Sequence, residues 1–365
     1  MVMKLGIVGL PNVGKSTLFN ALTQTQAAEA ANYPFCTIEP NQGKVGVPDA
    51  RLTTLAQLAG SQKIIPTQIT FVDIAGLVKG ASKGEGLGNQ FLSHIREVDA
   101  IVHVVRCFEN GDVTHVEGSV DPLRDIDTIE TELMLSDLER AEKQQVKIAK
   151  LAKSGDKDAK EAQAVLSAVL AALAQGQPAR TLPDDMKKTS FFHDLQMITG
   201  KPLLYVANVG EAEATTGNPH VTKVQHFVTG QGSGVVMIAA AIESEIAQLP
   251  EDEKEVFLAE LGLSESGLSR LIRASYDVLG LMTFFTVGPK EARAWTVHRG
   301  AKAPQAAGEI HTDFEKGFIR AETIADNEYI VCKGESGARD AGKLRTEGKE
   351  YSVQDGDVMH FLFNV

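Results

Sequence analysis

A glycine-rich segment near the start of the chain has the residue types and spacing of a phosphate-binding loop. Residues 9–17 read Gly-Leu-Pro-Asn-Val-Gly-Lys-Ser-Thr, a full match to the pattern G-x-x-x-x-G-K-[ST], between an apolar run and a helix-like segment. Glycines let the backbone turn so that successive N–H groups face phosphate oxygens, and the following helix adds the positive end of its dipole. We expect Lys15, which we also count as catalytic, to reach the β- and γ-phosphates of a nucleoside triphosphate. The residues predicted to bind this nucleotide are Asn12, Val13, Gly14, Lys15, Ser16 and Thr17.

Two features downstream supply what such a site needs for magnesium. Asp73-Ile-Ala-Gly76 follows an apolar run, and an aspartate at a strand end can hold Mg²⁺ through a water while the Gly76 N–H contacts the γ-phosphate. Thr37 lies between the two motifs, where a threonine hydroxyl can complete the metal shell. We therefore expect Ser16, Thr37 and Asp73 to form the metal site. Leu77 stands where many GTPases have the glutamine that orients the attacking water, so hydrolysis should be slow or should use another group.

The residues expected at the nucleotide base differ from those of GTPases. Asn208-Val209-Gly210-Glu211 follows the apolar run 203–207, where Asn-Lys-x-Asp is expected for guanine. In the guanine motif the aspartate accepts hydrogen bonds from N1–H and the N2 amine, and adenine offers neither donor. Losing this arrangement relaxes or inverts the preference for guanine. Asn208, Val209 and Glu211 are therefore predicted to contact the base, with ATP preferred and mixed use of ATP and GTP as the alternative.

The elements that would position these residues alternate between strand and helix signals. Apolar, β-branched runs at 69–72, 100–105, 202–207 and 235–238 indicate strands buried on both faces of a mostly parallel sheet. This pattern predicts a doubly wound α/β fold containing the P-loop. A stretch dense in Ala, Leu, Glu, Lys and Gln predicts an inserted α-helical hairpin of coiled-coil type, which is either a solvated structural element or a partner-binding one. From residue 281 onward, short strand signals between glycine-rich turns predict a small α+β domain.

These signals divide the chain into four expected segments. They are a first nucleotide-binding part at 1–126, the hairpin at 127–190, a second nucleotide-binding part at 191–280 and the small domain at 281–365.

Composition excludes several classes of protein. Hydrophobic residues make up 43% of the chain and charged residues 23%, and no run approaches 18 apolar residues, so we expect a cytoplasmic protein that does not contact membranes. The net charge of −12 argues against broad, non-specific nucleic-acid binding. Any contact with RNA would have to use a local patch. Three scattered cysteines favour neither a disulfide framework nor a zinc site.

Taken together, the motifs resemble the YchF/Ola1 group of Obg-like ATPases over essentially all 365 residues. The segments that carry the resemblance are 9–17, 33–37, 73–81, 84–92, 115–122 and 208–211. The resemblance implies a nucleotide domain with an inserted hairpin and a C-terminal TGS domain of β-grasp type. It also implies ATP preference, dependence on Mg²⁺ and association with the ribosome, with RNA as a further partner of the TGS domain and hairpin. A monomer is expected.

Carried over by position, the resemblance assigns the phosphates to residues 12–17, Mg²⁺ to Ser16 and Thr37, and the base to Val209. His115 is our candidate for the missing water-orienting group, because it lies in a glycine-containing loop and imidazole accepts a proton near neutral pH. Asn12 resembles an asparagine that supports K⁺-stimulated hydrolysis in related NTPases, so K⁺ is a further expected ion.

Three functions fit the sequence unequally well. A slow, Mg²⁺-dependent ATPase that acts as a nucleotide-dependent switch on the ribosome is favoured. The alternative is a non-enzymatic adaptor that ATP merely stabilises. A metabolic phosphotransferase is disfavoured, because no segment resembles a lid or an acceptor pocket.

Overall fold

A computed structural model describes residues 3–30, 41–74, 87–111, 115–116, 118–153, 157–231 and 233–364. The chain forms two compact units. The larger unit comprises Lys4–Gly43 and Phe71–Leu271, and the smaller unit comprises Met1–Met3, Lys44–Thr70 and Ile272–Val365. Across the described residues, none of the helices combines the length and hydrophobicity that spanning a bilayer requires.

The larger unit is built on a sheet with the strand order β2-β4-β1-β5-β6-β7. Its β1–β5, β5–β6 and β6–β7 pairs are all parallel. Every residue of β5 and β6 is buried, as expected for strands covered on both faces. The predicted mostly parallel α/β sheet is therefore confirmed. The strands are β1 (Lys4–Val8), β2 (Gln42–Gly46), β4 (Gln68–Asp73), β5 (Ala100–Arg106), β6 (Leu203–Asn208) and β7 (Gly234–Ile238); β2 and β4 cross the division between the units.

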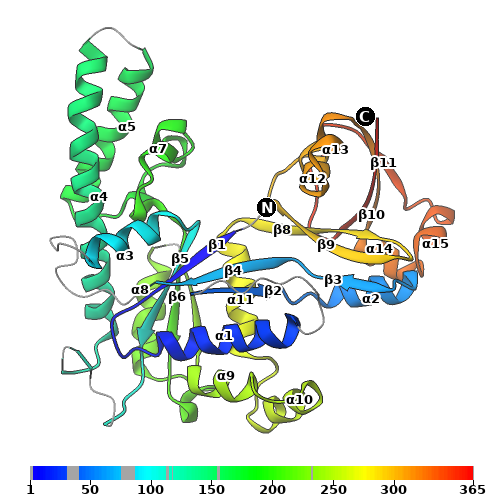
Figure 1. Cartoon of the computed structure of the whole chain (residues 1–365), viewed down its shortest axis with the longest axis horizontal. Helices are drawn as coiled ribbons and strands as arrows, with labels where there is room; N and C mark the ends of the chain where they lie inside the picture. Colours follow the sequence, from blue (N-terminus) through cyan, green and yellow to red (C-terminus); the bar gives the residue numbers. More distant parts are fainter. Residues whose placement is uncertain are drawn as a thin grey trace. The chain divides into compact units, whose positions relative to one another are not determined.

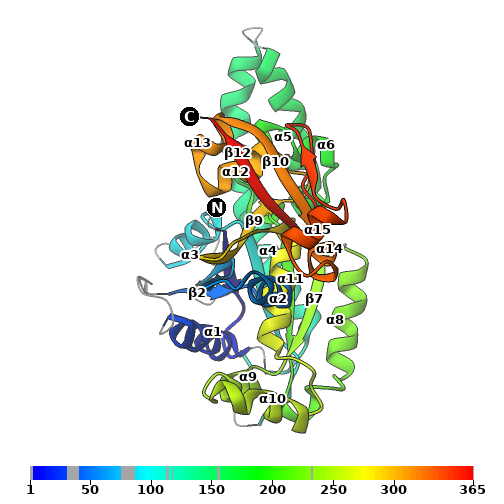
Figure 2. The same cartoon turned by 90° about the vertical axis from the view of Figure 1, so that its right-hand side faces the viewer.

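Helices cover both sides of this sheet, and α1 and α8 lie on opposite sides of it in Figure 2. The phosphate loop leads directly from β1 into α1, so the sheet fixes where this helix begins. Helices of the larger unit outside the hairpin region are α1 (Lys15–Ala30), α3 (Leu87–Arg96), α8 (Pro219–Thr229), α9 (Ala240–Ile246) and α10 (Glu251–Glu260), with α11 (Gly267–Val278) crossing the division.

The expected helical hairpin is present. Helices α4 (Pro122–Lys153) and α5 (Lys157–Ala174) lie side by side and pack against each other (Figure 1). Their shared core includes Ala141, Val165 and Val169. α4 begins earlier than the expected boundary at 127, because Pro122 suits a first helical turn and Asp121 accepts a hydrogen bond from the Arg124 N–H at 3.3 Å. Short turns return the chain to β6: η2 (Ala179–Thr181), α6 (Asp184–Lys187), α7 (Ser190–Leu195) and η3 (Ile198–Gly200).

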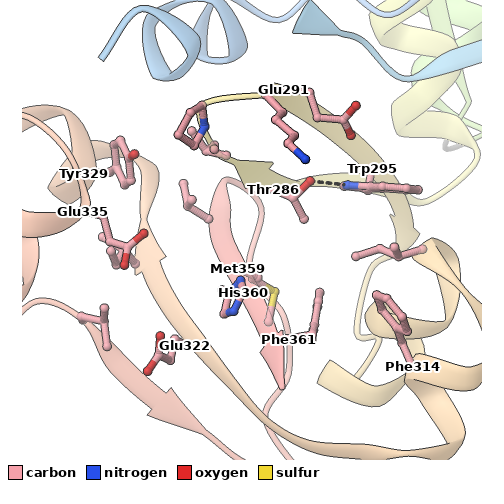
Figure 3. A pocket seen from close by; sticks show the side chains of 18 of the residues that line it. Thr286, Glu291, Trp295, Phe314, Glu322, Tyr329, Glu335, Met359, His360 and Phe361 are labelled. Atoms are coloured by element: carbon pink, nitrogen blue, oxygen red, sulfur yellow. Dashed lines mark hydrogen bonds between the residues drawn. The ribbon is translucent and has the colours of Figure 1, made fainter. Parts of the chain in front are cut away.

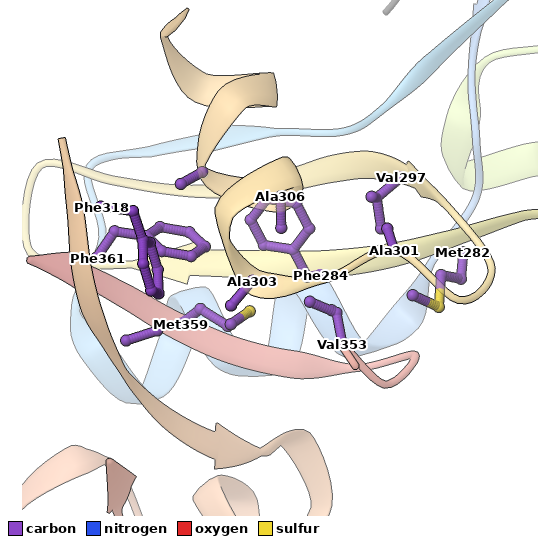
Figure 4. Close-up of a cluster of buried hydrophobic side chains, with 12 residues drawn as sticks. Met282, Phe284, Val297, Ala301, Ala303, Ala306, Phe318, Val353, Met359 and Phe361 are labelled. Carbon is purple, nitrogen blue, oxygen red and sulfur yellow. The ribbon is translucent and has the colours of Figure 1, made fainter. Parts of the chain in front are cut away.

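The smaller unit is an α+β structure with the strand order β11-β10-β12-β8-β9-β3. Helix α12 and the sheet enclose a core that contains Phe284, Phe318 and Phe361 (Figure 4). The strands are β3 (Lys63–Ile65), β8 (Leu281–Val287), β9 (Glu291–His298), β10 (Phe318–Ala325), β11 (Arg345–Glu347) and β12 (Asp357–Phe363). The helices are α2 (Ala50–Ala59), α12 (Ala303–Ile310), α13 (Thr312–Lys316), α14 (Asp326–Val331) and α15 (Glu335–Asp340).

One segment is grouped differently from the expected order of domains. The expected boundaries put Lys44–Thr70 in the first nucleotide-binding part, whereas in the structure these residues belong to the smaller unit. The reason is long-range pairing: β3 runs parallel to β9, and α2 packs against β8, β9 and α14.

Candidate nucleotide site

The loop between β1 and α1 has a backbone that requires glycine at one position. Gly14 has a φ of 91° and Asn12 a φ of 63°, both in the left-handed region. A Cβ at position 14 would lie 2.1 Å from Nδ2 of Asn208, so only glycine fits there. α1 begins at Lys15 and has no acidic residue in its first turn. The loop therefore ends at a helix N-terminus, and no acidic side chain in the first turn compensates its positive end. Such an arrangement favours phosphate.

Asn208 holds this loop from the end of β6. Its Nδ2 donates a hydrogen bond to the Val13 carbonyl at 2.9 Å, and its Oδ1 accepts one from the Ala240 N–H at 3.0 Å. The residue is only 4% exposed. The side chain predicted to contact the base thus joins the phosphate loop to the start of α9. Its contact with a nucleotide stays a prediction.

The phosphate loop and the end of β4 meet through an ion pair. Lys15 Nζ donates to Asp73 Oδ1, and the lysine is largely buried while the aspartate is partly exposed. Ser16 and Thr17 are exposed in the first turn of α1. The structure therefore brings together a cation, a carboxylate and two hydroxyl-bearing residues from two separate motifs. This set fits a magnesium triphosphate, because Mg²⁺ prefers oxygen ligands shared with phosphate groups.

Three other predicted positions cannot be placed. Thr37, predicted to bind the metal, and Gly76, predicted to contact the γ-phosphate, lie outside the described residues, as does Leu77.

The two residues predicted to face the base alongside Asn208 differ in exposure. Val209 is 3% exposed, and its N–H donates to the Ile238 carbonyl at 2.8 Å. Glu211 begins the short turn η4 (Glu211–Glu213) and is exposed. Glu213 braces this turn, since its Oε2 accepts hydrogen bonds from the Gly210 N–H at 3.3 Å and the Asn218 amide at 2.8 Å. An apolar residue and a carboxylate thus stand where the guanine motif has lysine and aspartate.

Sequence reasoning missed Arg106, which supports the phosphate loop from the end of β5. It is 1% exposed, and its guanidinium donates to the Asn12 carbonyl at 3.3 Å and the Asn110 carbonyl at 3.4 Å. Its guanidinium carbon lies 4.4 Å from the centre of the Phe108 ring. Burial lowers the pKa of Arg106. The available signal was a charged residue at the end of a strand that is otherwise apolar apart from His103.

His115 is buried rather than exposed in its loop. Its Nε2 lies 2.7 Å from Asp125 Oδ2, and both side chains are 2% exposed. Burial raises the pKa of the Asp125 carboxyl, whereas the hydrogen bond from His115 opposes that rise. Asp125 lies in the first turn of α4, so the candidate catalytic ring is attached to the base of the hairpin. A catalytic role for His115 stays a prediction, and it requires this contact to open.

Two family models match separate parts of the chain. Residues 4–151 match MMR_HSR1, described as a 50S ribosome-binding GTPase. Residues 281–364 match YchF-GTPase_C, described as a protein of unknown function.

Several relatives match the whole chain along their own whole length. The ribosome-binding ATPase YchF of Bacillus subtilis is 55% identical over 367 residues, with 100% of both chains covered. The proteins of the same name from Haemophilus influenzae and Mycoplasma genitalium are 56% and 48% identical, again with 100% of both chains covered. A solved structure, described as that of the Schizosaccharomyces pombe YchF GTPase, is 39% identical with a TM-score of 0.89 and covers 99% of this chain and 97% of its own.

Proposed function

This chain belongs to the YchF family, and from that membership and its site we propose that it binds ATP with Mg²⁺, hydrolyses it slowly and associates with the ribosome. The observation that carries the proposal is the meeting of Lys15 and Asp73 beside the N-terminus of α1. A magnesium triphosphate needs a cation for its phosphates and a carboxylate for its metal shell. Nucleotide binding would separate this ion pair. Lys15 would then face the phosphates, and Asp73 would face the magnesium ion.

The choice of nucleotide rests on the turn after β6. The names of the sequence relatives say ATPase, whereas the name of the solved structure says GTPase. We therefore infer the preferred nucleotide from the side chains of this chain. Val209 supplies no ammonium to cover a base, and Glu211 replaces the shorter aspartate that pairs with guanine. A site that forms hydrogen bonds with guanine discriminates strongly against adenine. Because this chain lacks the residues that form those bonds, we expect it to prefer ATP.

Slow turnover follows from the groups that would act on water. When bound, Mg²⁺ neutralises charge on the phosphates and orients them. Ser16 and Thr37 would offer hydroxyls to the metal, and the Gly76 N–H would contact the γ-phosphate. Leu77 cannot polarise water, so His115 would have to leave Asp125 before it could orient the nucleophile. That step should limit the rate.

Several finer parts of the proposal depend on the family alone. We include K⁺ as a second ion near Asn12, RNA contact through the hairpin and a TGS-type C-terminal domain, a monomeric state and a cytoplasmic location. Support for the ribosome comes from the names of the relatives, which read ribosome-binding ATPase.

Side-by-side titration with Mg·ATP and Mg·GTP tests the choice of nucleotide. We expect tighter binding of ATP by the natural chain and no binding of either nucleotide by Lys15→Ala. A double variant, Val209→Lys with Glu211→Asp, rebuilds the guanine motif and should shift the preference towards GTP. Binding of GTP that is about tenfold tighter in the natural chain would overturn the choice of ATP.

The buried His115–Asp125 contact favours a second candidate, an adaptor that binds ATP without hydrolysing it. Single-turnover hydrolysis with and without ribosomes separates the two candidates. Ribosome-stimulated release of phosphate supports the switch, and tight ATP binding without phosphate release in either condition supports the adaptor.

A further inference from the structure

A cavity of about 680 Å³ opens in the smaller unit, and none of its lining residues belongs to the candidate nucleotide site. It lies where two pairs of strands diverge. β8 pairs with β9 along its whole length, and β10 pairs with β12 in the same way. Among the described residues, β8 and β12 are in register only at Phe285 and Val358. Beyond that point the edges of β8 and β12 face a gap, and side chains from both pairs line it (Figure 3).

The walls of this cavity are mainly aromatic and apolar. Trp295 is held in place, because its Nε1 donates to Thr286 Oγ1 at 2.8 Å and the guanidinium carbon of Arg293 lies 4.0 Å from its ring centre. Phe314 and Phe363 stack at 3.8 Å on another wall. Preformed aromatic walls of this kind suit the apolar parts of a ligand.

Carboxylates outnumber cations among the lining residues. Glu291, Glu322 and Glu335 line the cavity, against one lysine, Lys290. Glu335 pairs with Arg339 at 2.9 Å. Within the described parts of the chain, the half-buried Glu291 and Glu322 side chains make no hydrogen bond or ion pair. Two carboxylates without partners in an aromatic cavity are complementary to a basic group.

We propose that this cavity binds an extended basic segment of a partner protein. Apolar side chains of the segment lie against Trp295 and Phe361, which share one face of the sheet. Lys or Arg side chains reach Glu322 on the other face and Glu291 at the start of β9. Its backbone adds to the edge of β8 or β12, as in other complexes in which a peptide extends a sheet. The carboxylates exclude nucleic acid from this place, because phosphates would approach like charge. The inference goes beyond the proposed ATPase and does not depend on it.

The chain contains one tryptophan, Trp295, which gives a direct reporter of occupancy. The full chain is titrated with a capped Arg-Val-Lys-Val-Arg-Val peptide while tryptophan fluorescence is recorded. We expect a saturable change, weakened by salt, and no change with the matched Glu-Val-Glu-Val-Glu-Val peptide. Equal responses to the two peptides, or no saturable response to the basic one, would overturn the proposal.

Two further ligands test the class of occupant. Spermidine has amine charges without a strand backbone, and a uridine hexanucleotide has phosphates. Both should bind more weakly than the basic peptide. If spermidine binds as tightly as the peptide and displaces it, the ligand of this cavity is a small polyamine and the peptide proposal is wrong. If the oligonucleotide binds more tightly than the peptide, the cavity prefers negative charge, which also contradicts the proposal.

Variants assign the response to the two carboxylates. Glu291→Gln with Glu322→Gln should weaken the basic peptide by about tenfold or more, because hydrogen bonds to charged groups are stronger than those between neutral groups. Each single variant should weaken binding by part of this amount. The single variants therefore test the proposal even if the double variant does not fold. Glu315→Gln removes the same charge from α13, outside the lining, and should bind the peptide normally. No nucleotide is present, so this result stands or falls separately from ATP binding.

Discussion

At the scale of single residues, buried polar side chains give the phosphate loop its shape. Asn208 satisfies one carbonyl and one N–H that would otherwise be buried without partners. Gly14 leaves room for the Asn208 amide, and Arg106 holds the carbonyl of Asn12. A loop fixed in this way is already arranged for an anion, so less ordering free energy is lost when phosphate binds.

Replacing Asn208 with alanine should loosen this loop. The Val13 carbonyl and the Ala240 N–H would lose their partner, which should lower the free energy of unfolding by about 1–3 kcal/mol. ATP should also bind more weakly, because the loop must then be ordered on binding. Urea unfolding and ATP titration measure both effects. The exposed Asn20→Ala on α1 is the control, and equal midpoints for the two variants would contradict the expectation.

His103 makes the stability of the larger unit depend on pH. It is fully buried beside the ring of Tyr205, and burial lowers its pKa from 6.5 to about 3. Below pH 6.5 the unfolded chain therefore binds a proton that the folded chain does not, so the folded state loses stability as pH falls. His103→Phe should remove about 1.4 kcal/mol per pH unit from that slope between pH 6 and pH 4. Urea unfolding at several pH values tests this, and equal slopes for both proteins would refute it.

The sequence identifies the motif residues of the candidate site better than the residues that support them. Lys15 and Asp73 belong to local motifs, and the structure brings them together. The motif predicts that Asn208 contacts the base, and in the structure its amide is bonded to the Val13 carbonyl and the Ala240 N–H. Arg106 and Asp125 were missed, because their partners are far along the chain or become buried only when the chain folds.

At the scale of elements, Asp137 fastens the hairpin helix α4 to the chain that returns to β6. It is 0% exposed, and its carboxylate accepts hydrogen bonds from the Ile198 N–H at 2.9 Å and the Thr199 N–H at 2.7 Å. Arg96 lies 3.3 Å away on another side. One carboxylate therefore joins the helix α4, the turn η3 and the helix α3.

Asp137→Ala should detach this junction. Two buried N–H groups and an arginine would lose their acceptor, at a cost of about 3–5 kcal/mol in the free energy of unfolding. Protease cleavage between α5 and β6 should accelerate in parallel. Glu139→Ala on the same helix removes an exposed pair with Lys143 and should change stability by less than about 1 kcal/mol. Similar decreases in the free energy of unfolding for the two variants would contradict this role of Asp137.

Element type was predictable where the signal is local. The hairpin follows from a long stretch of helix-forming residues, and the buried strands follow from apolar runs. The placement of α2 and β3 in the smaller unit was not predictable, because β3 pairs with β9, more than two hundred residues away. A short apolar segment indicates a strand and does not indicate which sheet it joins.

At the scale of the whole molecule, negative charge limits how the chain can bind a ribosome. The sequence holds 36 Lys and Arg against 48 Asp and Glu. From residue 281 onward the balance is 11 against 13, so this part of the chain offers no general excess of positive charge. Binding dominated by RNA phosphates would require such an excess. We therefore expect contacts that are local and partly made with protein.

This expectation has a measurable form in the salt dependence of ribosome binding. Each phosphate contact contributes about 0.7–0.9 to the slope of log affinity against log salt, so two contacts reduce affinity by about tenfold between 50 and 200 mM. Co-sedimentation of the full chain with ribosomes across this range should show a loss of about tenfold or less. A basic peptide that fills the cavity beside Trp295 should compete if that cavity helps to bind the ribosome. A loss of about a thousandfold would instead require many phosphate contacts, and a basic surface patch would then have to outweigh the overall charge of −12.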